Sequence, residues 1–298
     1  MSIHRHLSIS RFLILLCLLA GASAHAQTSL YEISKDNQKI YLGGTIHLLR
    51  SSDYPLPAEY DHAYQQADVL VLETNLDNAA SPEFGQKMAK AFMYSGGKTL
   101  AEDLQPALWQ ELQTFSAARQ YPIAQMSAFK AMFVSLSLSV VEMQRLGFGV
   151  AEGVDMVFFQ KAKTDSKPVL ELESGDEVLT QLALLADMDA NMVIKATLRD
   201  LHKMDAVLEK ALGYWRRGEL EKLDREMSAD MRREAPEVYQ HLLIARNQAW
   251  LPKIEKLFAT TDVELVLVGS LHLSSKDGLL AQLKQRGYQV KPYLAKQP

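Results

Sequence analysis

The apolar pattern divides the chain into strand-like segments near its two ends and helix-like segments between them. Apolar runs typical of β-strands cover 30–34, 39–43, 69–72, 168–172, 263–268 and 288–293. Helical periodicity covers 58–66, 83–94, 106–120, 122–146, 154–163, 176–186, 190–212, 219–228, 236–258 and 275–286. Asp36 and Asn37 favour a turn, so the first two strands predict a β-hairpin. We therefore predict an α/β fold with a central mixed β-sheet built from N- and C-terminal strands, flanked by helices.

The first 26 residues predict a secretory signal peptide. Cationic residues such as Arg5 precede an apolar stretch at 12–20, and an A-x-A cleavage site ends at Ala26. The apolar stretch is shorter than the about 20 residues of a membrane-spanning helix, so we expect no stable membrane anchor. The protein is then exported, most simply to a periplasm, and cleaved after Ala26. The expected mature chain, 27–298, is a single domain whose helical middle section covers about 81–258.

Composition narrows the chemistry of the mature chain. Cys17, the only cysteine, lies in the predicted leader, so any metal site must use His, Asp or Glu. Loss of Arg5 and Arg11 from the 32 basic residues leaves 30 against 36 acidic residues. A mildly acidic chain with no basic run argues against nucleic acid as a partner.

Two short segments far apart in the chain repeat one pattern. Gly44 and His47 follow the predicted hairpin, and Gly269 and His272 follow the strand at 263–268. With 15 Gly and 8 His in the chain, chance gives roughly 0.4 G-x-x-H patterns, so two copies in matching contexts indicate a shared role. A glycine leaves room for a turn or a close backbone approach at such a position; a plain β-turn is the alternative.

Polar residues end four predicted strands: His47, Glu73, Glu173 and His272. Because α/β folds gather their chemistry at the carboxyl ends of parallel strands, we expect these side chains to face one crevice. Two imidazoles and one or two carboxylates match a site for Zn, Mn, Fe(II) or Co with open positions for water and substrate. We assign His47, Glu73 and His272 as metal ligands and Glu173 as fourth ligand or general base. A structural hydrogen-bonding role is the alternative for each.

A second candidate lies on the helix at 236–258. Arg246 and Trp250 are four residues apart and share a helix face, so they are expected to stack. If Arg246 points into the crevice, it would bind a substrate carboxylate or stabilise a developing oxyanion. A role in packing alone is the alternative. Asp155 reads as a helix cap rather than as a catalytic acid. The other helical histidines, at positions 62, 202 and 241, are assigned to the surface or to packing.

In combination and in order, these segments resemble the TraB/GumN family, which is related to the Tiki proteins. The resemblance rests on the runs 41–47, 71–73, 153–155, 172–173, 246–250 and 268–273. It implies a mixed α/β fold with a metal-dependent site, and the Tiki proteins are metalloproteases that need Mn or Co. His47 and His272 match the motif histidines and Glu73 the acid after the core strand, while Glu173 and Arg246 match positions typical of the family. Gly43 and Ser174 depart from the family pattern without touching a predicted ligand.

Two functions follow as alternatives. The first is a metal-dependent hydrolase, most readily a peptidase, that uses Mn, Co or Zn and acts on an exported peptide or protein. The second is a noncatalytic periplasmic binding protein that sequesters a peptide signal, a metal or a haem-like ligand in the same crevice. The partner in either case is a peptide or small molecule.

Overall fold

The computed structural model describes residues 28–294. The signal peptide predicted for 1–26 lies outside these residues. The strands are β1 (Leu30–Lys35), β2 (Gln38–Thr45), β3 (Val69–Leu72), β4 (Val169–Glu171), β5 (Glu264–Gly269) and β6 (Gln289–Pro292). The helices are α2 (Ala58–Gln66), α3 (Leu76–Ala79), α4 (Pro82–Phe92), α5 (Leu100–Asp103), α6 (Pro106–Ala118), α7 (Ala131–Arg145), α8 (Val154–Asp165), α9 (Gly175–Ala183), α10 (Ala190–Leu201), α11 (Met204–Arg216), α12 (Leu220–Glu234), α13 (Pro236–Tyr239), α14 (Ala245–Leu257) and α15 (Leu279–Gln285).

The six strands form one mixed sheet in the order β4-β3-β5-β2-β1-β6. The hairpin β1–β2 is antiparallel, as predicted, and β6 adds antiparallel to β1. The neighbours β4, β3, β5 and β2 are all parallel. Strands from both ends of the chain therefore share the centre of the sheet, which confirms the predicted α/β class.

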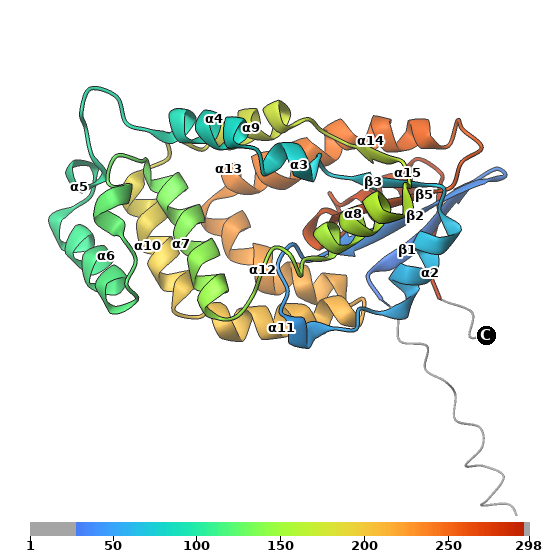
Figure 1. Cartoon of the computed structure of the whole chain (residues 1–298), viewed down its shortest axis with the longest axis horizontal. Helices are drawn as coiled ribbons and strands as arrows, with labels where there is room; N and C mark the ends of the chain where they lie inside the picture. Colours follow the sequence, from blue (N-terminus) through green and yellow to red (C-terminus); the bar gives the residue numbers. More distant parts are fainter. Residues whose placement is uncertain (1–27, 295–298) are drawn as a thin grey trace, which may run out of the picture.

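Two hydrophobic cores hold the fold together. One surrounds the sheet and includes fully buried Trp215, Trp250 and all four central β5 residues, 265–268. The other lies among helices and is built around residues such as Phe92, Leu112 and Ile194. Figure 1 shows the sheet at one end of the molecule and α5, α6, α7 and α10 at the other. The second core explains how a long helical section between sequence-distant strands stays folded.

An aromatic cluster fixes the hairpin against its helices. The rings of Tyr60 on α2 and Trp215 on α11 lie 5.8 Å apart, and Phe158 on α8 lies 6.3 Å from Tyr60. Trp215 donates its indole N–H to the carbonyl of Gly44 at 2.7 Å, and the hydroxyl of Tyr60 donates to the same oxygen. The end of β2 is thus held in place directly before His47.

Two of the helices predicted as continuous are broken by non-helical residues. The segment predicted as one helix at 122–146 contains a short 3-10 turn, Ile123–Met126, and then an extended stretch before α7. There Phe129 pairs with Met93, and Lys130 donates its N–H to the carbonyl of Phe92 at 2.7 Å, so the backbone bonds to α4 instead of to itself.

The helix predicted at 190–212 ends at Leu201 and restarts at Met204. Leu201 belongs to the helical core, whereas Ala211 belongs to the sheet core, so the chain must turn between them. His202 lies at this turn, where its Nδ1–H donates to the carbonyl of Leu198 and its ring packs 5.2 Å from the ring of Phe115. Tertiary packing overrides helix periodicity in both places.

The helix predicted at 236–258 is interrupted by a π-helical turn at Gln240–Ile244, directly before Arg246. The helix predicted from 275 starts only at Leu279.

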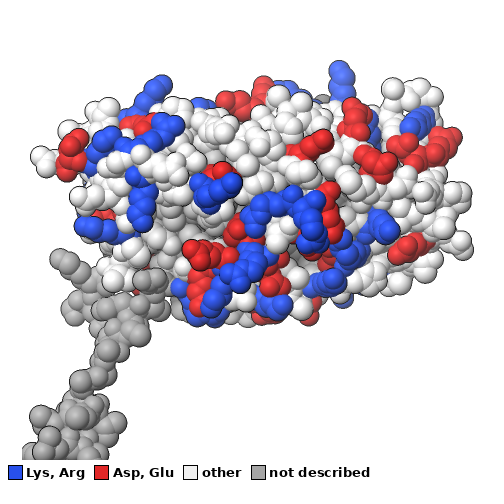
Figure 2. All heavy atoms as spheres, turned by 180° about the vertical axis from the view of Figure 1, so that it is seen from behind, with Lys and Arg blue, Asp and Glu red and all other residues white. Residues whose placement is uncertain are grey.

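None of the helices within residues 28–294 combines the length and apolar character that crossing a bilayer requires. Positive and negative side chains are interspersed on the face drawn in Figure 2.

Candidate functional site

The predicted strand-end residues meet at one edge of the sheet. Since β4, β3, β5 and β2 are parallel neighbours, their carboxyl ends lie side by side. Glu73 follows β3 directly, Glu173 comes two residues after β4, and His47 comes two residues after β2. His272 ends the 3-10 turn that follows β5. The topology therefore delivers all four side chains to the same rim.

His47 is held by a carboxylate from α8. Its Nδ1 donates to Oδ2 of Asp155 at 2.8 Å, and the other oxygen of Asp155 accepts the hydroxyl of Thr45 at 2.8 Å. Asp155 raises the pKa of His47 to about 9. The helix approaches closely because Gly153 has no Cβ: one would lie 2.0 Å from the carbonyl oxygen of His47. With Nδ1 anchored, the ring presents Nε2 to the site.

His272 is held by a side-chain amide from α14. Asn247 donates its amide N–H to the carbonyls of His272 and Asp277, at 3.3 and 3.0 Å, which turns its Oδ1 toward Nδ1 of His272 at 2.8 Å. Nδ1 therefore carries the proton, and Nε2 has a lone pair that accepts from Nη1 of Arg246. Burial lowers the pKa of His272 to about 3, so the ring is neutral at physiological pH.

Arg246 connects the two acids. Its Nη2 donates to Oε2 of Glu73 at 2.6 Å, its Nε donates to Oε1 of Glu173 at 2.9 Å, and its Nη1 lies 3.2 Å from Nε2 of His272. The guanidinium also stacks 4.6 Å above the ring of Trp250, which confirms the predicted pair. The π-helical turn one residue before Arg246 is a feature often found at functional sites.

The pKa values of the two acids are shifted in opposite directions. Burial alone would raise the pKa of Glu73, but Arg246 and the two histidines hold it at about 2. Burial dominates at Glu173 and raises its pKa despite the contact with Arg246. Two carboxyl groups on one guanidinium thus have opposite pKa shifts, an arrangement that enzymes use to separate acid and base roles.

The donor types at this rim, two imidazoles and a carboxylate, are those that bind divalent ions in proteins. A Cβ on Gly269 would lie 3.1 Å from Nε2 of His47 and 3.3 Å from Oε1 of Glu73, so the absent side chain leaves a cradle between them. Nε2 of His272 lies 3.9 Å from the same glutamate oxygen. Within residues 28–294, no three His, Asp or Glu groups stand close enough as placed to hold an ion. Ligation therefore requires the half-exposed ring of His47 and the guanidinium of Arg246 to shift.

The close backbone approach predicted for the two glycines is found at Gly44, whereas the atoms nearest to Gly269 belong to side chains. A Cβ on Gly44 would lie 2.8 Å from Oγ of Ser270 and 3.1 Å from its Cα, so Gly44 lets the two matching turns touch. The hydroxyl of Ser270 then donates to the carbonyl of Thr45 at 2.8 Å. The repeated segments pack on each other, but their glycines differ: Gly44 serves packing, and Gly269 opens the site.

The structure brings His47, Glu73, Glu173, Arg246 and His272 into one cluster, while their chemical roles stay predictions. Sequence reasoning missed two supporting residues. Asp155 was assigned to helix capping, although it anchors His47 and Thr45. Asn247 was not singled out, although it fixes His272. Both lie within the runs 153–155 and 246–250 that carry the family resemblance, which was the available signal.

Comparison with known proteins defines the class of this chain. The model of the TraB/PrgY/gumN family matches residues 29–292, so the chain belongs to that family. It is 25% identical over 248 residues to the uncharacterized protein YbaP of Escherichia coli strain K12, an alignment that covers 83% of this chain and 89% of that protein. YbaP of Shigella flexneri shows the same identity and coverage. No solved structure matches the chain significantly.

Proposed function

We propose that the protein is an exported metal-dependent hydrolase, acting as a peptidase on a peptide or protein substrate. The observation that carries the proposal is the matched anchoring of two histidines. Asp155 and Asn247 each bind an Nδ1 atom, which directs Nε2 of His47 and of His272 toward the site near the carboxylate of Glu73. Because the pKa of His47 is raised to about 9, an ion would have to displace a proton from its Nε2. Histidines oriented in this way by a second side chain are typical of metal sites.

His47, Glu73 and His272 are the residues proposed to hold the ion, which is Mn, Co or Zn. Such an ion supplies a Lewis acid and lowers the pKa of bound water from about 16 toward about 7. Three protein ligands leave further coordination positions for water and substrate. Because Arg246 Nη1 lies 3.2 Å from Nε2 of His272, the guanidinium and the ion compete for that nitrogen.

Arg246 and Glu173 are proposed to handle the substrate. Once the ion has displaced it from His272, Nη1 of Arg246 would donate to the carbonyl oxygen of the bond that is cleaved. The carboxylate of Glu173 accepts the Nε–H of Arg246, and the residue is only 5% exposed. Glu173 is therefore proposed as the general base that takes up a proton released at the site. Export after cleavage behind Ala26 is part of the proposal.

Metal content tests the proposal directly. Mature protein starting at Gln27 is purified from medium with Mn, Co and Zn, and bound metal is measured by mass spectrometry. We expect about one ion per chain in the wild type and loss of it in His47→Ala and in His272→Ala. His62→Ala, on α2 and outside the site, is the matched control and keeps the ion.

Cleavage of a peptide library with each metal then separates a hydrolase from a binding protein. Metal-dependent cleavage that disappears in Glu173→Gln supports the proposed reaction. Wild-type metal content in both site-histidine variants would contradict the ligand assignment. Saturable peptide binding without cleavage under every metal would instead identify the noncatalytic binding protein.

A further inference from the structure

Trp250 on α14 contacts two members of the candidate site through the face of its indole. Its side chain is buried, with 0% exposed. The ring centres of Trp250 and His272 lie 4.4 Å apart, and the guanidinium carbon of Arg246 lies 4.6 Å from the centre of the same indole. One aromatic side chain therefore packs against a proposed metal ligand after β5 and against the proposed substrate-binding arginine of its own helix.

The indole N–H of Trp250 is the second notable feature. Its nitrogen is closed to solvent, and among the described residues no acceptor completes a hydrogen bond with it. The indole N–H of Trp215, which is also buried, donates to the carbonyl of Gly44 at 2.7 Å. A buried tryptophan usually finds an acceptor for its N–H, because leaving the donor unpaired is costly. The unpaired donor at Trp250 therefore calls for an acceptor close by.

Glu173 is the acceptor nearest in effect to this N–H. Burial raises the pKa of Glu173, whereas Arg246 and the indole of Trp250 both favour its charged form. Nε of Arg246 binds Oε1 of Glu173 at 2.9 Å, so the guanidinium already satisfies part of this carboxylate. With Arg246 bound in this way, the indole is close to Glu173 but falls short of hydrogen-bond geometry.

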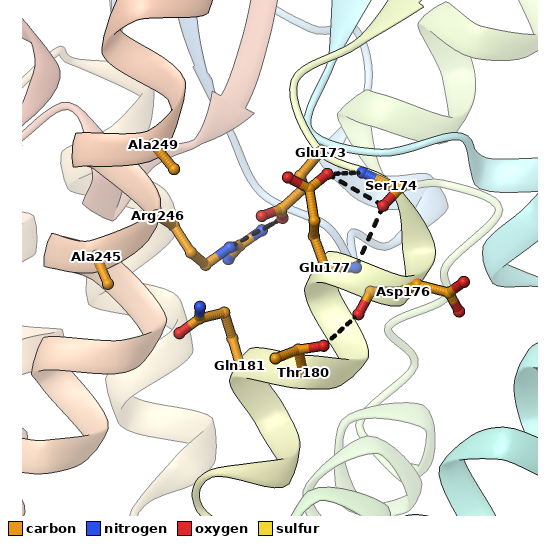
Figure 3. A pocket seen from close by; sticks show the side chains of 9 residues that line it. All are labelled: Glu173, Ser174, Asp176, Glu177, Thr180, Gln181, Ala245, Arg246 and Ala249. Carbon is orange, nitrogen blue, oxygen red and sulfur yellow. Dashed lines mark hydrogen bonds and ion pairs between the residues drawn. The ribbon is translucent and has the colours of Figure 1, made fainter.

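Arg246 has room to move within the site. An ion bound to Nε2 of His272 would displace the guanidinium, whose Nη1 lies 3.2 Å from that nitrogen. A pocket of about 290 Å³ opens beside Arg246 and Glu173, and Figure 3 shows Ala245 and Ala249 on the α14 side of it. Because these side chains are small, the pocket can accept the displaced guanidinium. Such a shift would loosen its bond with Glu173 and free the carboxylate for another donor.

We propose that Trp250 is a positioning residue that serves three groups of the candidate site. The face of its indole aligns the ring of His272 and the guanidinium of Arg246. Its N–H donates to Glu173 once the guanidinium has shifted. The value of that last contact for a general base rests on the proposed function, whereas the contacts themselves do not.

NMR of the indole N–H groups tests the contact with Glu173 without turnover or metal. Mature protein with isotope-labelled tryptophan gives signals from Trp109, Trp215 and Trp250, and Trp250→Phe identifies the last of them. In metal-free protein, Arg246→Ala removes the competing donor. We expect the Trp250 signal to move downfield in this variant and to return in Arg246→Ala/Glu173→Gln, while the Trp109 signal stays in place.

Zinc affinity tests the face of the indole. Trp250→Leu removes the aromatic face and should weaken zinc binding by about tenfold or more, as when a group that supports a metal ligand is lost. Trp250→Phe keeps an aromatic face and should bind zinc at least about threefold more tightly than Trp250→Leu. Trp109→Phe is the matched control, because Trp109 packs against the helical core, and it should bind zinc like the wild type.

Turnover separates the N–H from the face. With a library peptide that the wild type cleaves, Trp250→Phe should lower kcat by about tenfold or more and change KM by less than about threefold. The physical reason is the loss of a hydrogen bond to a charged group that acts in the reaction and not in substrate binding. Trp109→Phe should keep both constants. A merely structural role of Trp250 would not divide kcat from KM in this way.

The outcomes distinguish this proposal from the proposed function. A Trp250 signal that does not move in folded Arg246→Ala, or that fails to return in the double variant, would overturn the contact with Glu173. Wild-type zinc affinity in folded Trp250→Leu would overturn the alignment by the indole face. Absence of zinc binding by the wild type would refute the metal-dependent hydrolase, while the metal-free NMR comparison would still decide whether Trp250 donates to Glu173.

Discussion

Substitution of Gly269 by Ala tests whether the space beside β5 is the metal cradle. Gly269 has φ −52° and ψ 135°, a conformation that alanine adopts freely. The new methyl group would lie 3.1 Å from Nε2 of His47 and 3.3 Å from Oε1 of Glu73. The substitution therefore places one carbon in contact with two predicted ligand atoms without straining the backbone.

The expected effect on metal binding is large and the effect on stability small. An ion bound to both atoms must lie within about 2.2 Å of each, and a methyl group in contact with both atoms would obstruct their approach to one ion. We expect metal affinity to fall by at least about 10- to 100-fold, as when a supporting residue is lost. Reduced freedom of the unfolded chain stabilises alanine by about 0.4–1 kcal/mol and offsets the two tight contacts, so the free energy of unfolding should change by less than about 1 kcal/mol.

Calorimetric titration with Mn and Zn measures the affinity, and urea denaturation measures the free energy of unfolding. Gly85→Ala on α4 is the control, because a Cβ there meets nothing within 4 Å. It should keep wild-type metal affinity. A folded Gly269→Ala protein that binds metal as tightly as the wild type would refute the placement of the ion between His47 and Glu73.

Two further predictions concern stability. Gly153→Ala should lower the free energy of unfolding by about 2 kcal/mol or more, because the new Cβ would lie 2.0 Å from the backbone oxygen of His47. A free energy of unfolding, measured in urea, within about 0.5 kcal/mol of the wild-type value would contradict the close approach. Glu264→Gln should stabilise the protein at pH 8 by on the order of 1 kcal/mol, because burial raises the pKa of this 2% exposed carboxyl group. A carboxyl group whose pKa is higher in the folded state destabilises the fold at a pH above that pKa, but not at a pH below its pKa in the unfolded state. The stabilisation by Glu264→Gln should therefore shrink as the pH falls toward about 4. A gain that grows on acidification would show that the charge of Glu264 is satisfied.

The sequence by itself determined the strands, the hairpin and most of the site. Four-residue β3 and nine-residue α2 have the predicted bounds because their apolar patterns are dense and their neighbours are turn formers. The strand-end positions of His47, Glu73, Glu173 and His272 could be identified because a polar residue directly or a few positions after an apolar strand is recognisable in the sequence alone. Their assembly at one rim needed only parallel strand order.

Tertiary structure alone decided which groups support that rim and where the long helices break. Asp155 and Asn247 reach His47 and His272 across 108 and 25 residues, distances over which local periodicity carries no information. The interruptions before Ala131 and at His202 occur where the chain bonds to α4 or crosses between two cores. Long-range packing outweighs helix propensity at such positions because each residue contributes less than about 1 kcal/mol of propensity. The repeated Gly-x-x-His segments illustrate this difference. Their sequences match, but only the fold shows that one glycine serves packing and the other borders the site.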